Sequence, residues 1–151
     1  MKKLLLIFCS VLIFSAFLKN TLAFKNDIAV NFNEVNWEND IDLAFNLASI
    51  SNKIIMVEFM ADWCPPCKKM DSETFSNERV IKKLNEFILV KINVDTQQDI
   101  AEEYNGNAKK YGGIGIPNIL FLDKEKNILH RIVGFHNPSQ LISVMDSVLT
   151  K

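Results

Sequence analysis

Apolar and polar positions along this chain predict one domain of alternating strands and helices behind an apolar N-terminal run. Residues 53–60 and 87–94 are nearly continuous apolar runs, which favour strands buried on both faces. A third run, over 119–122, leads through a charged turn into a return strand over 128–135, where Gly134 is the expected bulge. These segments predict one central sheet.

The segments between these predicted strands have apolar residues at helical spacing. Residues 39–51 carry apolar side chains at helical spacing, with Asn39 available as the N-cap. A second helical segment covers 76–85, and the polar stretch 95–111 is helix-like with a turn before its end. Pro138 starts the last helix, at a position that proline favours. The element order predicts an α/β fold with a central mixed β-sheet flanked by helices.

Residues 1–23 have the pattern of a secretory signal peptide. Two lysines precede an apolar run over 4–18, and small residues lead up to Ala23. The run is shorter than the roughly 20 residues of a membrane-spanning helix. The alternative is an uncleaved segment that anchors the protein to the inner membrane. Cys9 lies inside the run, where it does not resemble a lipidation site, and we expect it to leave with the signal peptide.

The remainder, residues 24–151, is long enough for one domain with its own core. The chain has 17 basic and 18 acidic residues, and loss of three signal-peptide lysines leaves 14 against 18, a net charge of −4. No basic cluster is interleaved with aromatic residues, so nothing indicates nucleic-acid binding. Residues 24–37, partly alternating, predict an edge strand or a loosely attached arm.

Cys64 and Cys67 are the strongest candidates for chemistry. Residues i and i+3 share one helix face, so this pair can form a disulfide or open to a dithiol without refolding. At the helix N-terminus, unpaired N–H groups and the helix dipole favour a thiolate, so Cys64 is the expected nucleophile. Cys67, one turn further in, is the expected resolving residue. Pro65 and Pro66 fit the first turn and remove two potential donors to the Cys64 sulfur.

Two other interpretations of the cysteine pair stay open. A structural zinc site requires four ligands, and beyond the two cysteines the exported chain offers only His130 and His136, neither at ligand spacing. We therefore expect no metal. A static structural disulfide is the second alternative, although a bridge over three residues constrains the unfolded chain little.

The stretch around the cysteines resembles a known family. Residues 57–68 read VEFMADWCPPCK, and residues 115–117, Gly-Ile-Pro, follow about fifty positions later. This combination is similar to the thioredoxin family. Residues 61–64 together with 74–76 are most similar to the C-terminal thioredoxin domain of DsbD-type bacterial disulfide reductases. The resemblance covers about residues 54–149, and it implies a thioredoxin fold.

The resemblance also implies a substrate groove. Gly-Ile-Pro matches the family's cis-proline loop, so we expect a cis peptide bond before Pro117 and a loop that faces Cys64. Free backbone groups of Ile116 are then able to pair with an extended substrate peptide as an added strand. The expected substrate-binding residues are Trp63, Pro65, Pro66, Ile116 and Pro117.

Two acids complete the expected site. Glu58 interrupts a buried strand, where a carboxyl group should have a raised pKa unless it is paired or faces an edge. The resemblance assigns the acid at this position the role of proton acceptor for Cys67. Asp71, four residues after Cys67, falls on the same helix face and matches a second acid that opposes thiolate formation. The alternative for Asp71 is a solvated surface acid beside Lys68.

These expectations define a thiol–disulfide oxidoreductase without a cofactor beyond the redox-active Cys64–Cys67 disulfide. Pro65 and Pro66 supply neither charge nor donor, and nearby acids raise the pKa of Cys64, so we expect a protein-disulfide reductase. Its expected location is the periplasm. Its expected partners are disulfide-containing proteins and a membrane electron donor of the DsbD type, with the protein itself a monomer. A disulfide oxidase or isomerase of the same fold, and a non-catalytic binding or assembly module, are the alternatives.

Overall fold

A single mixed sheet organises the computed structural model, which describes residues 35–150. Its strand order is β2-β1-β3-β4, with β1 parallel to β2 and antiparallel to β3, and β3 antiparallel to β4. The prediction of a central mixed sheet is confirmed. The expected signal peptide, Cys9 and most of the N-terminal arm lie outside the described residues. The strands are β1 Ile55–Met60, β2 Ile88–Asn93, β3 Asn118–Leu122 and β4 Ile128–Val133.

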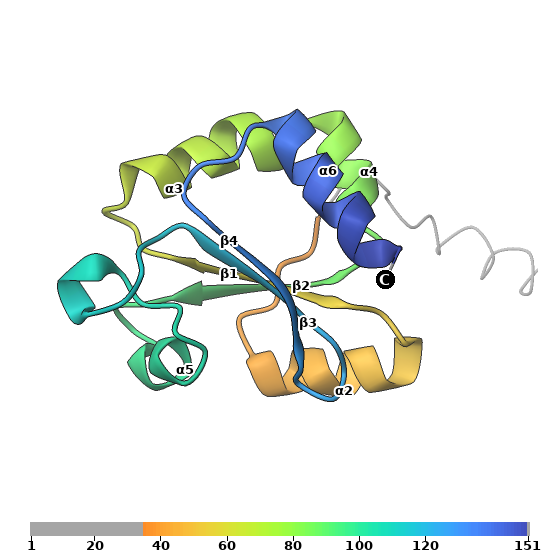
Figure 1. Cartoon of the computed structure of the whole chain (residues 1–151), viewed down its shortest axis with the longest axis horizontal. Coiled ribbons are helices and arrows are strands. Elements are labelled where there is room, and N and C mark those ends of the chain that lie inside the picture. The colour runs from red at the N-terminus through yellow and green to blue at the C-terminus, as the bar shows by residue number, and fades with distance from the viewer. Residues whose placement is uncertain (1–34, 151) are drawn as a thin grey trace, which may run out of the picture. The chain divides into compact units, whose positions relative to one another are not determined.

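Helices cover both faces of this sheet (Figure 1). One face carries α2 and α5, and the other carries the helical segment after the cysteines together with α4 and α6. Alternate side chains of β1 pack on opposite faces of the sheet: Val57 lies on the α2 side and Met56 on the α6 side. The helical elements are α2 Ile41–Ser51, α3 Pro65–Lys69, the π-helix η1 Met70–Phe75, α4 Glu78–Leu84, α5 Gln98–Glu103, the 3₁₀-helix η2 Lys109–Tyr111 and α6 Pro138–Leu149. Among the described residues, no helix is long and apolar enough to cross a membrane.

Side-chain caps fix where the helices begin. The expected N-cap Asn39 is wrong, because Asp40 has the extended backbone of a cap and accepts hydrogen bonds from the N–H groups of Asp42 and Leu43. At the start of α6, Asn137 and Gln140 form a reciprocal capping box, with Pro138 at the first helical position as predicted.

One further expectation needs correction. The register of β3 with β4 shifts at Phe121 and Leu122, which pair with His130 and Ile128, so the bulge lies within β4 at Leu129. Gly134 follows the end of β4, where its φ of +90° suits glycine. The helix-like stretch expected over 95–111, with a turn before its end, is confirmed: α5 and η2 are separated by a turn in which Asn105 has a left-handed φ of +50°.

The described end of the N-terminal arm lies along β2, which is the edge opposite β4 in the strand order. Glu38 forms a parallel bridge with Val90, through its N–H to the Leu89 carbonyl and through its own carbonyl to the Lys91 N–H. Trp37 packs edge-on against Phe75, with ring centroids 5.1 Å apart. Residues 35–38 are therefore attached to the domain.

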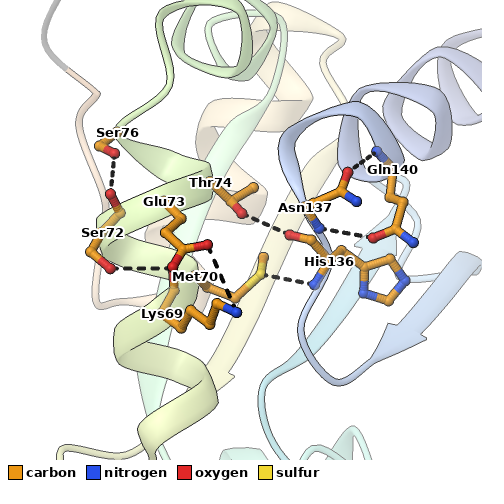
Figure 2. Close-up of polar contacts among 9 residues, drawn as sticks. All are labelled: Lys69, Met70, Ser72, Glu73, Thr74, Ser76, His136, Asn137 and Gln140. Atoms are coloured by element: carbon orange, nitrogen blue, oxygen red, sulfur yellow. Dashed lines mark hydrogen bonds and ion pairs between the residues drawn. The ribbon is translucent and has the colours of Figure 1, made fainter.

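Polar contacts join the π-helix to the loop before α6 (Figure 2). The buried Thr74 hydroxyl donates to the His136 carbonyl at 2.7 Å, and the His136 N–H donates to the Met70 sulfur at 3.2 Å. The helix that follows the cysteines is thus tied to the C-terminal helix by contacts distant in sequence.

We expect Thr74→Val to lower the free energy of unfolding by about 1 to 2 kcal/mol, because the His136 carbonyl loses its donor while side-chain volume is kept. The measurement is chemical denaturation at neutral pH. Ser76→Ala is the matched control, since the exposed Ser76 hydroxyl bonds only to Ser72 within the same segment. Equal effects of the two substitutions would contradict the prediction.

Candidate active site

Cys64 and Cys67 form a disulfide at the start of α3. The S–S distance is 2.06 Å and the Cα atoms are 5.3 Å apart. Cys64 is the N-cap of the helix, and its sulfur accepts a hydrogen bond from the Cys67 N–H at 3.2 Å. Pro65 and Pro66 occupy the first two helical positions and have no N–H to donate. The local sequence therefore leaves one backbone donor near the Cys64 sulfur.

The disulfide is covered on most sides. Cys67 is fully buried and Cys64 is only 2% exposed, so the two sulfurs differ little in burial in the oxidised state. Both pack in the apolar cluster on the α2 side of the sheet, and the half-buried Ile116 packs against the same cluster. The residues on either side of Cys64, Trp63 and Pro65, are exposed.

A buried acid lies in the strand that leads to the cysteines. Glu58 of β1 is fully buried and pairs in register with Lys91 of β2, whose ammonium nitrogen lies 3.2 Å from Oε2 of Glu58. Neither carboxylate oxygen of Glu58 has a hydrogen-bond partner of good geometry among the described residues. The Lys91 ammonium instead donates to Asp71 of η1 at 2.6 Å. The structure thus joins the two predicted acids through one lysine.

Burial dominates the electrostatics of this group. It raises the pKa of Glu58 to about 7 against the attraction of Lys91, and the negative charge of Asp71 raises it further. Burial alone would lower the pKa of Lys91, but the carboxylates of Glu58 and Asp71 outweigh it and raise that pKa. The Lys91 ammonium also lies over the rings of Trp37 and Phe75, at 4.8 and 5.5 Å from their centroids. The predicted raised pKa of Glu58 is confirmed, and its role as proton acceptor stays a prediction.

Sequence reasoning missed Lys91. A signal was present, because Lys91 is the only charged residue in the apolar strand 87–94. Strand order was required to place it beside Glu58. The expectation that Asp71 shares a face with Cys67 assumed a regular α-helix, whereas α3 ends at Lys69 and η1 follows. Asp71 is exposed, and its contact is with Lys91.

Trp63, directly before Cys64, is held by a second polar cluster. Its indole N–H donates to Asp95 at 2.6 Å, and the Tyr111 hydroxyl donates to the other oxygen of Asp95. Lys110 lies 3.2 Å from the same carboxylate and 3.9 Å from the Trp63 ring centroid. These hydrogen bonds lower the pKa of Asp95, and the one from Tyr111 has the largest effect. Trp63 nevertheless stays 45% exposed, which suits a residue that contacts a partner.

The Ile116–Pro117 peptide bond is cis, as expected. Gly115 before it has a φ of +118°, which only glycine adopts readily, and its N–H donates to the Asn107 carbonyl at 3.2 Å. The Pro117 carbonyl accepts from the Gly134 N–H at 2.7 Å. These bonds fix the loop that enters β3.

Residues 35–150 contain no group of three or more histidine, cysteine or acidic side chains arranged to hold a metal ion. The half-buried His136 ring is instead 3.0 Å from the Gly134 carbonyl through Nδ1. Both cysteine sulfurs are used in the disulfide. The bonded pair of cysteines supports thiol–disulfide exchange.

The disulfide at the start of α3 is preceded by a strand with a buried acid, and the chain also has a cis-proline loop. Together these features are typical of a thiol–disulfide oxidoreductase site on a thioredoxin fold. The family model described as a thioredoxin-like domain matches residues 41–149. The chain belongs to this thioredoxin-like family.

Individual relatives agree with this assignment. The chain is 28% identical, over an alignment of 155 positions, to thiol:disulfide interchange protein DsbD of Campylobacter jejuni; the alignment covers 96% of this chain and 27% of that protein. A thioredoxin from Thermus thermophilus shares the fold with a TM-score of 0.63 at 22% identity, covering 78% of this chain and 90% of that one. The C-terminal domain of Neisseria meningitidis DsbD gives 0.57 at 21% identity, covering 74% and 98%. The chain spans about a quarter of the length of the Campylobacter relative.

The raised pKa of Glu58 predicts a pH-dependent stability. The folded protein holds a proton that the unfolded chain releases above its ordinary pKa of 4.5, so the Glu58 contribution to the free energy of unfolding falls as pH rises from 4.5 to about 7. Glu58→Gln should remove this contribution. Denaturation of the oxidised protein at pH 4.5, 6 and 8 should show the variant gaining stability relative to wild type as pH rises. Glu102→Gln, at an exposed site on α5, is the control, and a pH-independent difference for Glu58→Gln would contradict the assignment.

Proposed function

We propose that this protein is a protein-disulfide reductase that acts beyond the inner membrane. The observation that carries the proposal is the Cys64–Cys67 disulfide at the N-terminus of α3, directly after a strand that holds a buried carboxyl group. The curated relatives named thiol:disulfide interchange protein DsbD support the same class of reaction.

In the proposed reaction, the reduced Cys64 thiolate attacks one sulfur of a substrate disulfide and the other substrate sulfur leaves as a thiolate. Cys67 then loses its proton, with Glu58 as acceptor, and attacks the Cys64 sulfur of the mixed disulfide. The substrate's second thiolate leaves, and the Cys64–Cys67 disulfide forms. The substrate gains two electrons and the protein loses two, so the cysteine pair needs no further cofactor.

The surroundings of the cysteines favour reduction of substrates over their oxidation. A strong disulfide oxidant stabilises its reduced thiolate with donors or positive charge. Here both residues between the cysteines are prolines, and the half-buried Lys91 in β2 is engaged by Glu58 and Asp71. Glu58, and Asp71 beyond it, add negative charge that opposes a Cys64 thiolate.

Partners follow from the electron balance. Each turnover leaves the cysteines oxidised, so a donor must return two electrons, and we infer a membrane electron donor of the DsbD type. Disulfide-containing proteins are the inferred substrates, bound at Trp63, Pro65, Pro66, Ile116 and Pro117. The inferred location is the periplasm, after cleavage of residues 1–23 or with that segment retained as an anchor, and the inferred state is a monomer.

We expect the protein to accelerate the reduction of insulin disulfides by dithiothreitol, measured as turbidity. Cys64→Ser should reduce the rate to that of dithiothreitol alone, because no attacking thiolate remains. Cys67→Ser should also lose turnover, and the reduced variant, freed of dithiothreitol and incubated with insulin, should accumulate a mixed disulfide visible on non-reducing gels. If wild type and Cys64→Ser gave equal rates, the cysteines would be a static disulfide in a binding module.

Equilibration with glutathione buffers should give a reduction potential near that of thioredoxin, about −270 mV, because little stabilises the Cys64 thiolate. Pro66→His introduces a donor and a positive charge between the cysteines and should make the potential less negative. Pro138→Ala, remote in sequence at the start of α6, is the control. A wild-type potential near about −120 mV would instead indicate a disulfide oxidase.

A further inference from the structure

One arginine forms hydrogen bonds with both ends of a loop that includes Ile116 and Pro117, two of the residues proposed to bind substrate. This 104–118 loop runs from the C-terminal end of α5 to the start of β3 and includes Lys110, Tyr111, Ile116 and Pro117. Arg131 lies in the neighbouring edge strand β4, and its backbone pairs in register with Leu120. Its side chain therefore approaches the loop from the sheet.

The guanidinium of Arg131 contacts both ends of the loop. Nη2 donates to the Tyr104 carbonyl at 2.6 Å, and Nη1 donates to the Asn105 carbonyl at 2.9 Å. Nη1 also lies 3.1 Å from Oδ1 of Asn118, the residue after the cis proline. The fully buried Asn118 amide donates in turn to the Asn105 carbonyl at 3.1 Å. Four hydrogen bonds thus converge where the loop begins and ends.

This geometry suits arginine in particular. Its planar fork donates in several directions at once, whereas a lysine ammonium has no fixed fork. The carbonyls of Tyr104 and Asn105 lie at the C-terminal end of α5, where helix carbonyls lack partners and cations are favoured. Arg131 is half-buried, and burial lowers its pKa, so its hydrogen bonds are made in a partly desolvated setting.

Between these two ends, the loop is held mainly by its own backbone. The Gly113 and Gly115 N–H groups donate to the carbonyls of Ala108 and Asn107. Gly106 lies so close to the Phe59 ring that a Cβ there would approach ring carbons to 2.3 Å. Tyr111 and Lys110 then extend from η2 to Asp95 and Trp63. A shift at the base of the loop would therefore reach both Trp63 and the cis-proline backbone.

We propose that Arg131 is a positioning residue for substrate binding: by joining the two ends of the 104–118 loop, it holds the Ile116–Pro117 backbone and the Lys110–Tyr111 segment in the geometry that receives a substrate peptide. This inference rests on the proposed function. Arg131 takes no part in the exchange at sulfur, so its loss affects recognition of large substrates and leaves the chemistry of the cysteines unchanged.

The test compares Arg131→Met, which keeps the aliphatic stem, with Arg79→Met at the chain's other arginine, an exposed position on α4. The substrate is a peptide with an internal disulfide, and dithiothreitol returns the two electrons after each turnover. Arg131→Met should raise KM about tenfold, as expected for loss of charge-assisted hydrogen bonds, with kcat unchanged. The rate of the reduced protein with Ellman's reagent, a small disulfide, and the glutathione reduction potential should stay at wild-type values. Arg79→Met should match wild type throughout.

Hydrogen exchange of the oxidised protein provides a readout that needs no turnover. In Arg131→Met, the Gly113 and Gly115 amides should exchange about tenfold faster, whereas amides of α2 keep their wild-type rates. Arg131→Lys, which retains the charge and most of the volume, should increase KM and the exchange rates less than Arg131→Met does. If Arg131→Met does not fold, Arg131→Lys is compared with wild type instead. Unchanged KM and exchange in a folded variant would overturn the inference. A wild-type protein that reduces no peptide would overturn the proposed function, and the exchange measurement alone would then decide the role of Arg131.

Discussion

Burial of the Glu58 carboxyl group is the constraint on which the rest of the domain depends. A carboxyl group in the middle of a central strand is costly unless a partner or a proton compensates it. Lys91 reaches it because β2 pairs with β1 in the observed register, and Asp71 joins through η1. Trp37 from the N-terminal arm then covers the lysine. One buried acid thus links the central sheet, the cysteine-bearing helical segment and the arm.

The cysteine pair owes its position to this same strand. β1 ends at Met60, and the chain turns so that Cys64 becomes the N-cap of a helix whose first two residues are prolines. Local backbone stabilisation of a thiolate is therefore limited, while a carboxyl group with a pKa of about 7 lies in the preceding strand. A group with that pKa can accept or return a proton near neutral pH with little cost.

The surface around Cys64 is assembled from segments far apart in the sequence. Trp63 comes from the turn after β1, Asp95 from the turn after β2, and Tyr111 from the 104–118 loop. Trp63 and Asp95 lie outside helices and strands, and Tyr111 lies in the short 3₁₀-helix η2. Their geometry depends on how the loop is held, and Arg131 of the edge strand supplies hydrogen bonds at the base of that loop. The cysteine pair is thus positioned by strand β1 and helix α3, whereas the exposed surface beside it is built largely from turns and loops.

The sequence by itself determined the features that depend on neighbouring residues: the buried strands, the proline at the start of α6 and the cysteine spacing. The cis bond before Pro117 was expected from the family resemblance, and the structure confirms it. The sequence pattern misplaced the N-cap at Asn39 and the bulge at Gly134, because both depend on backbone angles that adjacent elements impose. Lys91, Asp95 and Arg131 emerged only from the tertiary structure. Each acts on residues far away in the chain, and such contacts are set by strand order, register and loop path, which apolar periodicity does not encode.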